Sequence, residues 1–232
     1  LTRAATDKDK ALAWAAGPRA ADVGGGETDR RTVLAPGAVE TGSGMAVGSE
    51  ARDRSQSAVI VARDGRHSSQ DLAQAVAEGI MASGVNVIDI GMVPTPVLYY
   101  ATKTLTTRSG IMITGSHNPP EYNGFKIVIN DETLALDRIQ ALKKRIDEGK
   151  LHKGKGAYER QEVSADYIGR INNDVVLAKP MRVVLDSGNG VAGPLAMKLL
   201  DGLGCAVTPL YTDIDGNFPN HHPDPSKPEN LE

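Results

Sequence analysis

Ser116 lies in a short polar segment between two apolar runs, an arrangement typical of an exposed serine that takes part in chemistry. Residues 111–113 and 125–129 are dominated by isoleucine and other apolar residues, which predicts two buried strands. The segment between them contains Thr-Gly-Ser-His-Asn-Pro-Pro, and these residue types favour turns. We therefore expect Ser116 at the surface of a loop. The alternative is an ordinary connecting loop, which is what most Ser-His pairs belong to.

The residues around this serine favour a bent, polar loop beside a source of positive charge. Gly115 allows the backbone to turn without a side-chain clash. Asn118 precedes a proline, which restricts it to an extended conformation and holds His117 beside the hydroxyl. Arg63 and Arg66 follow another predicted strand at its carboxyl end, where open α/β sheets place ligand sites. Their alternative role is an Arg-Asp pair that braces the loop.

The order of the predicted elements is that of an α/β protein. Residues 1–56, rich in Ala, Gly, Asp and Arg, are predicted to be poorly ordered or divergent. We expect a three-layer α/β/α domain with a mixed sheet over 57–162 and the start of a second, similar α/β domain over 163–232. Strands are expected at 58–62, 85–90, 111–113, 125–129, 181–185 and 205–211, and helices at 69–83, 96–104, 134–148, 165–176 and 191–203. Residues 149–162 are interpreted as a connector between the domains.

Composition argues against several classes of function. The chain has 232 residues, enough for two modest domains, and its aromatic content of 4% predicts an aliphatic core. The net charge is -3, and the sequence lacks the basic stripe with interleaved aromatics that is typical of nucleic-acid binding. The single cysteine, Cys205, excludes a disulfide framework and lies in an apolar run, so we expect it to be buried. The sequence contains neither a long apolar run nor a signal peptide, so we expect no membrane association and a cytoplasmic location.

Two segments near the end of the chain contain residue types that bind metal ions in other settings. Residues 213–217 resemble the start of a calcium loop, but the glutamate that would complete it is missing. The adjacent His221 and His222 point in different directions on an extended chain, which disfavours a shared ligand. We expect a tight turn and a structural loop here, with a histidine metal pair as the alternative for the second segment.

The segment 110–129 resembles the phosphoserine signature of the alpha-D-phosphohexomutase family, which contains phosphomannomutases and phosphoglucomutases. Many consecutive positions agree, and the resemblance extends from about Gly44 to Glu232. It runs through Arg-Asp-Gly-Arg at 63–66, Gly-Met-Val-Pro-Thr-Pro at 91–96, Asp-Ser-Gly-Asn-Gly at 186–190, and Asp-Gly-Asn-Phe-Pro-Asn-His-His-Pro-Asp-Pro at 215–225. Within the family, the match favours the bacterial enzymes that act on mannose and glucose phosphates.

The resemblance implies that Ser116 is stored as a phosphoserine. The phosphoryl group would pass to a hexose phosphate to form a bisphosphate and return from the other oxygen, which interconverts hexose 1- and 6-phosphates. A phosphoserine carries about -1.5 to -2 charges at pH 7 and needs cationic neighbours. The resemblance also implies Mg²⁺ at a phosphoserine oxygen and glucose 1,6-bisphosphate, or an equivalent, as activator. The expected partners are therefore small hexose phosphates, and we expect a monomer.

The same resemblance suggests roles for the neighbouring polar residues. Lys126 matches the active-site lysine of the family and would stabilise charge or transfer a proton, with a solvated surface position as its alternative. His117 would relay a proton or orient the loop. Arg63, Arg66 and Asn118 would bind phosphate or substrate.

Departures from the family pattern limit what this chain is expected to do. No Tyr-Asp-Ile-Arg-Gly segment lies upstream of Ala58, and no Asp-Gly-Asp-Gly-Asp magnesium loop is present. The third and fourth domains of the family are also absent, so we expect an inactive amino-terminal fragment. The alternatives are a non-catalytic phosphosugar- or phosphopeptide-binding module and a mutase for glucosamine or N-acetylglucosamine phosphate. A serine hydrolase is disfavoured because Gly-x-Ser-x-Gly is missing.

Overall fold

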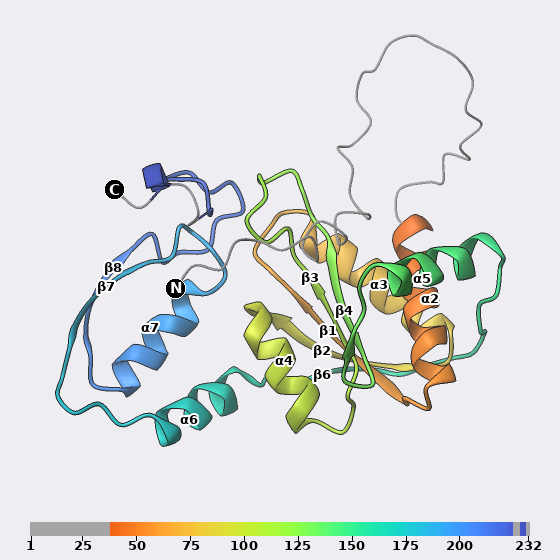
Figure 1. The fold of residues 1–232 in the computed structure, drawn as a ribbon, viewed down its shortest axis with the longest axis horizontal. Helices are drawn as coiled ribbons and strands as arrows, with labels where there is room; N and C mark the ends of the chain where they lie inside the picture. Colours follow the sequence, from red (N-terminus) through yellow and green to blue (C-terminus); the bar gives the residue numbers. More distant parts are fainter. Residues whose placement is uncertain (1–37, 225–227, 231–232) are drawn as a thin grey trace, which may run out of the picture.

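A computed structural model describes residues 38–224 and 228–230, which form two sheets and the helices around them (Figure 1). The helices are α2 (Ala38–Asp53), α3 (Ser69–Ala82), α4 (Thr95–Thr104), α5 (Asp137–Asp147), α6 (Ser164–Asp174), α7 (Gly193–Gly202) and the 3₁₀ helix η1 (Pro228–Asn230). The strands are β1 (Ala58–Arg63), β2 (Asn86–Met92), β3 (Gly110–Ile113), β4 (Phe125–Ile129), β5 (Glu132–Thr133), β6 (Tyr158–Arg160), β7 (Arg182–Asp186) and β8 (Ala206–Leu210).

The larger sheet is mixed, as predicted. Its strand order is β5-β4-β3-β1-β2-β6, and β1 pairs in parallel with both β2 and β3. The chain reverses after β3, so that β4 runs antiparallel to it, and β5 is antiparallel to β4. The segment between β3 and β4, residues 114–124, is called the serine loop below. It leaves the sheet at the edge where the parallel strands end, which is where such sheets present their binding residues.

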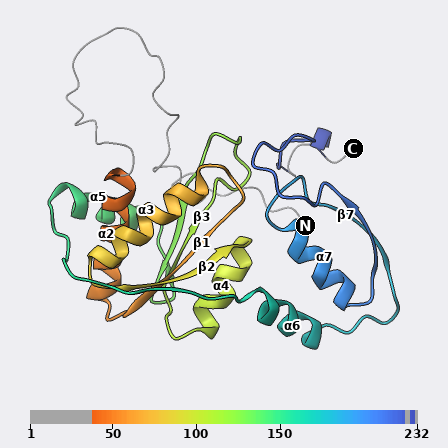
Figure 2. The ribbon, with the colours of Figure 1, turned by 180° about the vertical axis from the view of Figure 1, so that it is seen from behind.

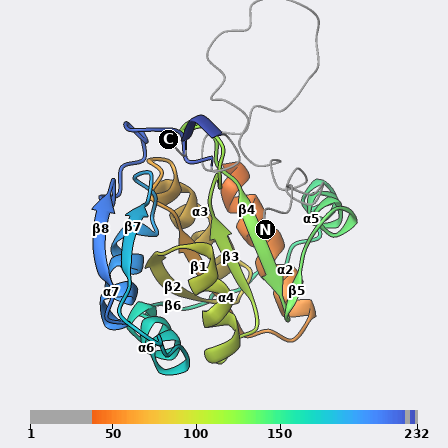
Figure 3. The same ribbon diagram turned by 60° about the vertical axis from the view of Figure 1, so that its left-hand side comes forward.

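Helices cover both faces of this sheet, which confirms the three-layer α/β/α architecture. Helices α2, α3 and α5 cover one face, where their apolar residues share a core with alternate residues of β1 to β4, as the view from behind shows (Figure 2). Helix α4 covers the other face and packs on the remaining apolar residues of β1, β2 and β3 (Figure 3). The two faces are called the α3 face and the α4 face below. No described helix is long and apolar enough to cross a membrane.

The prediction that residues up to 56 are poorly ordered is wrong for the part that the structure describes. Residues 38–53 form α2, whose Ala46, Val47 and Ala51 are buried in the core. The glycines misled the prediction because they permit close helix packing. A Cβ at Gly44 would lie only 2.2 Å from the carbonyl oxygen of Val76 on α3. Residues 1–37 lie outside the described part of the chain.

The segment predicted as a polar connector, 149–162, also contains structure. Residues 158–160 form β6 and pair in parallel with β2, which makes the connector an edge strand of the sheet. Sequence reasoning missed it because its three residues are all exposed and carry no apolar alternation. Helix α5 starts at Asp137, later than the predicted 134, since Leu134 is buried in the core before the helix begins.

The carboxyl-terminal part begins a second α/β unit, as predicted. Strands β7 and β8 are parallel neighbours joined by α7. Tyr167 of α6 and Leu195 of α7 pack against the apolar cluster under α4, so this unit adjoins the α4 face. A second contact is made by residues 213–218, called the second-domain turn, which touch the segment 63–67 after β1. Cys205 is buried, as expected.

Candidate active site

Ser116 is exposed at the tip of the serine loop, as the sequence predicts. Its backbone has φ of 54°, in the left-handed region that residues other than glycine rarely adopt. The backbone N–H of Ser116 donates to Oγ1 of Thr114 at 2.9 Å, which supports this bend. The Ser116 hydroxyl has no hydrogen-bond partner among the described residues. The loop therefore holds Ser116 in a strained backbone conformation that leaves its hydroxyl free and exposed to solvent.

Arg66 lies beneath the serine loop and not in the solvent, because its side chain is only 1% exposed. The five N–H groups of its guanidinium all have acceptors. Nε donates to Oδ2 of Asp64 (3.2 Å), Nη1 to the carbonyls of Pro119 (2.5 Å) and Tyr122 (3.1 Å), and Nη2 to those of Ser116 (2.9 Å) and Asn118 (2.7 Å). No donor is left for a substrate phosphate.

These contacts fit the bracing alternative for Arg66, and phosphate binding by Arg66 stays a prediction. Burial lowers the pKa of Arg66, but the Asp64 carboxylate opposes that shift and the group stays cationic. Asp64 also accepts hydrogen bonds from the Gly115 N–H at 3.3 Å and from the Ser69 hydroxyl at 2.5 Å. The amide of Asn123 donates to Ser69 Oγ at 2.8 Å and so ties the far end of the loop to α3.

Gly115 is required by the approach of the guanidinium. A Cβ at this position would lie 2.5 Å from both Cζ and Nε of Arg66 and 2.6 Å from the carbonyl oxygen of Tyr122. None of these atoms can move without breaking a hydrogen bond described above. The glycine was predicted for backbone freedom, but the positive φ falls on Ser116, and what Gly115 provides is space for the guanidinium.

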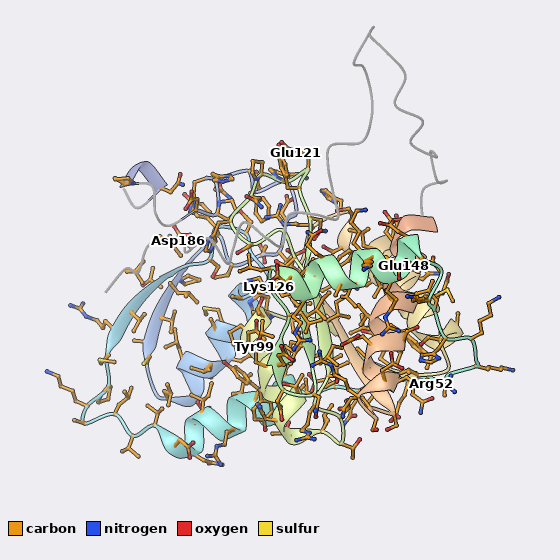
Figure 4. The ribbon with its side chains drawn as sticks, turned by 45° about the vertical axis from the view of Figure 1, so that its right-hand side comes forward. Arg52, Tyr99, Glu121, Lys126, Glu148 and Asp186 are labelled. Carbon is orange, nitrogen blue, oxygen red and sulfur yellow. The ribbon has the colours of Figure 1, made fainter. Side chains whose placement is uncertain are left out.

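Lys126 lies on β4, directly opposite Met112 of β3. Its neighbours Phe125 and Ile127 are buried in the core of the α3 face, so the alternation along the strand directs Lys126 to the α4 face. In Figure 4, Lys126 lies on the side of the sheet turned toward the carboxyl-terminal unit, and Glu121 lies on the serine loop above it. The lysine is half-buried and has no ion-pair partner among the described residues. A half-buried, unpaired ammonium beneath the serine loop can attract an anion.

His117 and Asn118 are both exposed on the serine loop, next to Ser116. Their side chains form no hydrogen bond with another described residue. The Asn118 backbone is held at both ends, since its N–H donates to the Gly115 carbonyl at 3.1 Å and its carbonyl accepts from Arg66. The structure thus brings three predicted site residues together on one loop, with two of their side chains free to contact a ligand beside the serine.

Arg63 is not brought to this group on the α4 face. It ends β1 on the same side as Val61, and both line a cavity of about 380 Å³ on the α3 face. This cavity also contains Asp89 and Tyr158, whose hydroxyl donates to the Asp89 carboxylate at 2.5 Å. That hydrogen bond raises the pKa of Tyr158. Arg63 and Lys126 therefore point to opposite faces of the sheet.

The second-domain turn covers the segment that carries Arg66. The Phe218 ring lies over the guanidinium of Arg66, with Cζ 5.1 Å from the ring centroid. Nε2 of His67 and Oδ1 of Asn217 are 3.1 Å apart. At Gly216, a Cβ would lie 2.9 Å from the carbonyl oxygen of the glycine after Asp64, so the two backbones touch. The second unit thus contacts the support of the serine loop directly.

The described residues contain no cluster of three or more His, Cys, Asp or Glu side chains that could hold a metal ion. The segment 213–217 forms a turn in which Oδ1 of Asp215 accepts the Asn217 N–H at 2.9 Å. His221 is structural, because its Nε2 lies 3.0 Å from both carboxylate oxygens of Asp186. The hydrogen bond to the His222 carbonyl is the largest cause that raises the pKa of His221, and the hydrogen bond to Asp186 is the second. The expected turn and structural loop are therefore both present.

Three residues that hold the serine loop in place were not identified from the sequence: Asp64, Ser69 and Asn123. The Arg-Asp pair after β1 indicated a bracing role without identifying which arginine provides it. The Asn123 side chain is buried and anchors the loop. A buried asparagine with two serine partners is a signal that only appears once α3 is placed beside β4.

Comparison with known proteins gives consistent matches along the chain. Residues 30–153 match the family profile described as "Phosphoglucomutase/phosphomannomutase, alpha/beta/alpha domain I", and residues 165–232 match the profile for domain II. A phosphomannomutase/phosphoglucomutase of Pseudomonas aeruginosa is 54% identical over 188 residues, which is 81% of this chain and 41% of that protein. A phosphoglucomutase of Neisseria meningitidis is 45% identical over 191 residues, which is 82% of this chain and 42% of that protein.

A solved structure gives the same result for the fold. A phosphoglucomutase/phosphomannomutase family protein of Burkholderia thailandensis superposes with a TM-score of 0.83 at 49% identity. The superposition covers 87% of this chain and 45% of that one. The chain therefore spans less than half the length of the relatives that it matches.

Proposed function

The chain belongs to the phosphoglucomutase/phosphomannomutase family, and we propose that it carries the phosphoserine part of a phosphohexomutase. The proposed reaction interconverts the 1- and 6-phosphates of mannose or glucose through a hexose bisphosphate. The names of the P. aeruginosa and N. meningitidis relatives support this substrate class. The cytoplasmic location and the monomeric state stay predictions.

The observation that carries this proposal is the free hydroxyl of Ser116 on a braced loop. The hydroxyl is exposed, while the backbone around it is held by the buried Arg66. A hydroxyl that served only the fold would bond to the protein. A reactive serine instead needs a fixed backbone and an open side chain, because positioning supplies much of the rate of a transfer reaction.

The proposed chemistry passes one phosphoryl group through Ser116. A sugar hydroxyl oxygen of the hexose phosphate attacks the phosphorus of phospho-Ser116, and the bond from phosphorus to Oγ breaks. The proton of that hydroxyl leaves to a base, and the sugar becomes a bisphosphate. In the second half, Oγ attacks the phosphorus of the other phosphate, and the bond from that phosphorus to its sugar oxygen breaks. The sugar oxygen takes the proton back from the base, and the phosphoserine forms again. Because the transition state spreads charge over the phosphoryl oxygens, positioned cations lower its energy.

Lys126 and His117 are the proposed catalytic partners of Ser116. The unpaired ammonium of Lys126 would offset the charge that develops on the phosphoryl oxygens. The imidazole of His117, which forms no hydrogen bond with another described residue, is the candidate to accept or return the sugar proton because it lies next to Ser116. Asn118 would donate its free side-chain amide to the substrate. Arg63 would contact a substrate only from the α3 face, which leaves it the weakest of the proposed binding residues.

A divalent cation such as Mg²⁺ would supply further charge neutralisation at a phosphoserine oxygen. The described residues do not fit such an ion, because they offer Ser116 but no cluster of carboxylates beside it. The proposed transfer steps involve the residues of the chain and the substrate alone. Glucose 1,6-bisphosphate, as the proposed activator, would load Ser116 directly.

The proposal can be tested in a chimera in which the aligned residues of this chain replace their counterparts in the P. aeruginosa relative. Identity of 54% over these residues favours a folded product. We expect conversion of glucose 1-phosphate to glucose 6-phosphate, with phosphate on Ser116 after incubation with glucose 1,6-bisphosphate. Ser116→Ala is expected to remove turnover, whereas Ser57→Ala, at an exposed serine where β1 begins, is expected to leave turnover unchanged.

The outcomes separate the proposal from its main alternative. Hexose phosphate binding without phosphate on Ser116 and without turnover would indicate a binding module and contradict the proposal. Turnover in Ser116→Ala would remove the covalent route. Phosphate mapped only to other residues by peptide mass spectrometry would do the same.

A further inference from the structure

Arg66 has an unusual environment for an arginine beside a proposed phosphate site. Its guanidinium is almost fully buried, and four of its five donors bond to backbone carbonyls of the serine loop. The fifth donor bonds to the Asp64 carboxylate. That carboxylate also accepts hydrogen bonds from the Arg66 backbone N–H and the Ser69 hydroxyl, which hold it in place. One side chain therefore binds four carbonyls of the loop. Only the Pro119 carbonyl has a donor within the loop as well, the Tyr122 N–H at 3.1 Å.

Only arginine has the donors that this arrangement needs. A guanidinium presents five N–H groups in one plane, whereas a lysine ammonium presents three. Substitution of Arg66 by lysine would remove at least two of the five side-chain hydrogen bonds, and the carbonyls of Ser116, Asn118 and Tyr122 depend on Arg66 alone among the described donors. A buried acceptor without a partner is unfavourable, so the loop would rearrange to hydrate its carbonyls.

The orientation of the carbonyls matters for the residue above them. Because the carbonyl of Ser116 points down at Arg66, the negative end of that peptide dipole points away from the exposed side of the loop. The same is true at Asn118. A phosphate dianion on the outer side of Ser116 is then not repelled by these oxygens at short range. If the guanidinium were removed, the carbonyls would be free to turn outward.

We infer that Arg66 is a positioning residue for Ser116, which holds the serine loop in the form that presents the hydroxyl and never touches the substrate. Its effect on the loop is independent of the reaction. Its effect on rate rests on the proposed function. These two consequences can be measured separately.

The first test measures the loop alone in the 232-residue chain. We expect Arg66→Lys to speed hydrogen–deuterium exchange of peptides spanning 114–124 by about tenfold or more, while peptides from β1 and β2 keep their protection. The matched control is Arg108→Lys, just before β3 at the end opposite the serine loop, where the arginine is 59% exposed and forms an ion pair with Asp131. In this control, the 114–124 peptides are expected to exchange as in the parent chain.

A second measurement needs no substitution and stands even if Arg66→Lys does not fold. Nuclear magnetic resonance of the unaltered chain labelled with ¹⁵N is expected to show separate, slowly exchanging Nη–H signals for Arg66. The exposed Arg108 is expected to show averaged signals that exchange rapidly. Averaged Nη–H signals for Arg66 would overturn the inference, because they would mean that the guanidinium rotates freely.

The rate consequence is measured in the chimera described above. Displacement of a reacting group by about 1 Å can cost about 100-fold in rate, so we expect Arg66→Lys to lower kcat by about 10- to 100-fold. KM is expected to stay within about twofold, because Arg66 has no donor for the substrate. Arg108→Lys is expected to leave both constants unchanged. A rise in KM at unchanged kcat would overturn the inference and assign Arg66 to substrate binding.

The two tests distinguish this inference from the proposed function. Faster loop exchange in Arg66→Lys, in a chimera whose parent form shows no turnover, would support the holding role of Arg66 and contradict the proposed function. Unchanged loop exchange in Arg66→Lys would overturn the inference even if the chimera is an active mutase.

Discussion

The close packing of α2 against α3 makes opposite predictions for two glycines of the same helix. Gly42 and Gly44 are two residues apart on α2 and both precede its middle. A Cβ at Gly44 would lie 2.2 Å from the carbonyl oxygen of Val76, whereas a Cβ at Gly42 would meet only the Ile146 side chain at 3.9 Å. Gly44→Ala therefore forces the helices apart, and Gly42→Ala adds a methyl group in ordinary contact.

The size of each effect follows from these distances. Ordinary van der Waals contact begins at 3.4 Å, so α2 would have to recede from α3 by about 1 Å at Gly44. Overpacking of this kind costs about 1–3 kcal/mol and occasionally more. Alanine gains about 1 kcal/mol over glycine in a helix, which offsets part of that cost at Gly44 and is the whole effect at Gly42. Because the clash at Gly44 is with backbone atoms, its cost belongs to the upper part of this range, about 2–3 kcal/mol, which leaves a net loss of about 1–2 kcal/mol for Gly44→Ala. For Gly42→Ala we expect a gain of about 0.5–1 kcal/mol.

Thermal unfolding of the 232-residue chain, followed by circular dichroism at 222 nm, measures both variants. At about 2–4 °C per kcal/mol for a chain of this size, Gly44→Ala is expected to lower Tm by about 2–8 °C. Gly42→Ala is expected to raise it by about 1–4 °C. Both variants change the unfolded chain in the same way. A difference in sign between their Tm shifts therefore reports on the folded state.

One result would refute this reasoning. If both substitutions raised Tm by similar amounts, α2 would not be packed against α3, and the segment 38–53 would be the poorly ordered stretch that its composition predicts. If both lowered Tm equally, the effect would come from the helix itself and the distances at Gly44 would be irrelevant.

Three further predictions concern the site and its supports. Lys126→Met in the chimera is expected to lower kcat by about 10²- to 10³-fold while Tm stays unchanged, and a rate within about threefold of the parent would place this lysine on a solvated surface. Phe218→Leu is expected to speed exchange of the serine loop by less than Arg66→Lys does, because it removes only the ring over the guanidinium; no change would mean that the ring does not restrain it. The raised pKa of His221 means that the folded state binds the imidazole proton more tightly than the unfolded state does. The contribution of His221 to the free energy of unfolding is therefore fully present below about pH 6.5 and is lost as pH rises through the folded pKa. His221→Gln is expected to flatten this part of the pH profile of unfolding, by less than about 1 kcal/mol for a partly exposed pair, and an unchanged profile would contradict it.

The sequence by itself determined the features that depend on local pattern. The apolar runs of β1, β3 and β4 are short and bounded by turn residues, so their strands could be placed within one or two residues. The exposed Ser116 followed from the polar turn between two of these runs. The apolar run 125–129 likewise placed Lys126 within a strand, although the face to which it points comes from the structure. Such features are encoded by neighbours in the chain, and no distant contact is needed to decide them.

Only the tertiary structure decided the roles that depend on what lies opposite a residue. Arg63 and Arg66 belong to the same four-residue motif, yet the pleat of β1 directs the first to the α3 face and the loop directs the second beneath Ser116. Helix α2 was missed for the same reason, because its glycines read as disorder until α3 is packed against them. Burial and the exact set of acceptors around a guanidinium are set by segments about 50 residues away in the chain, and one-dimensional periodicity contains no record of that distance.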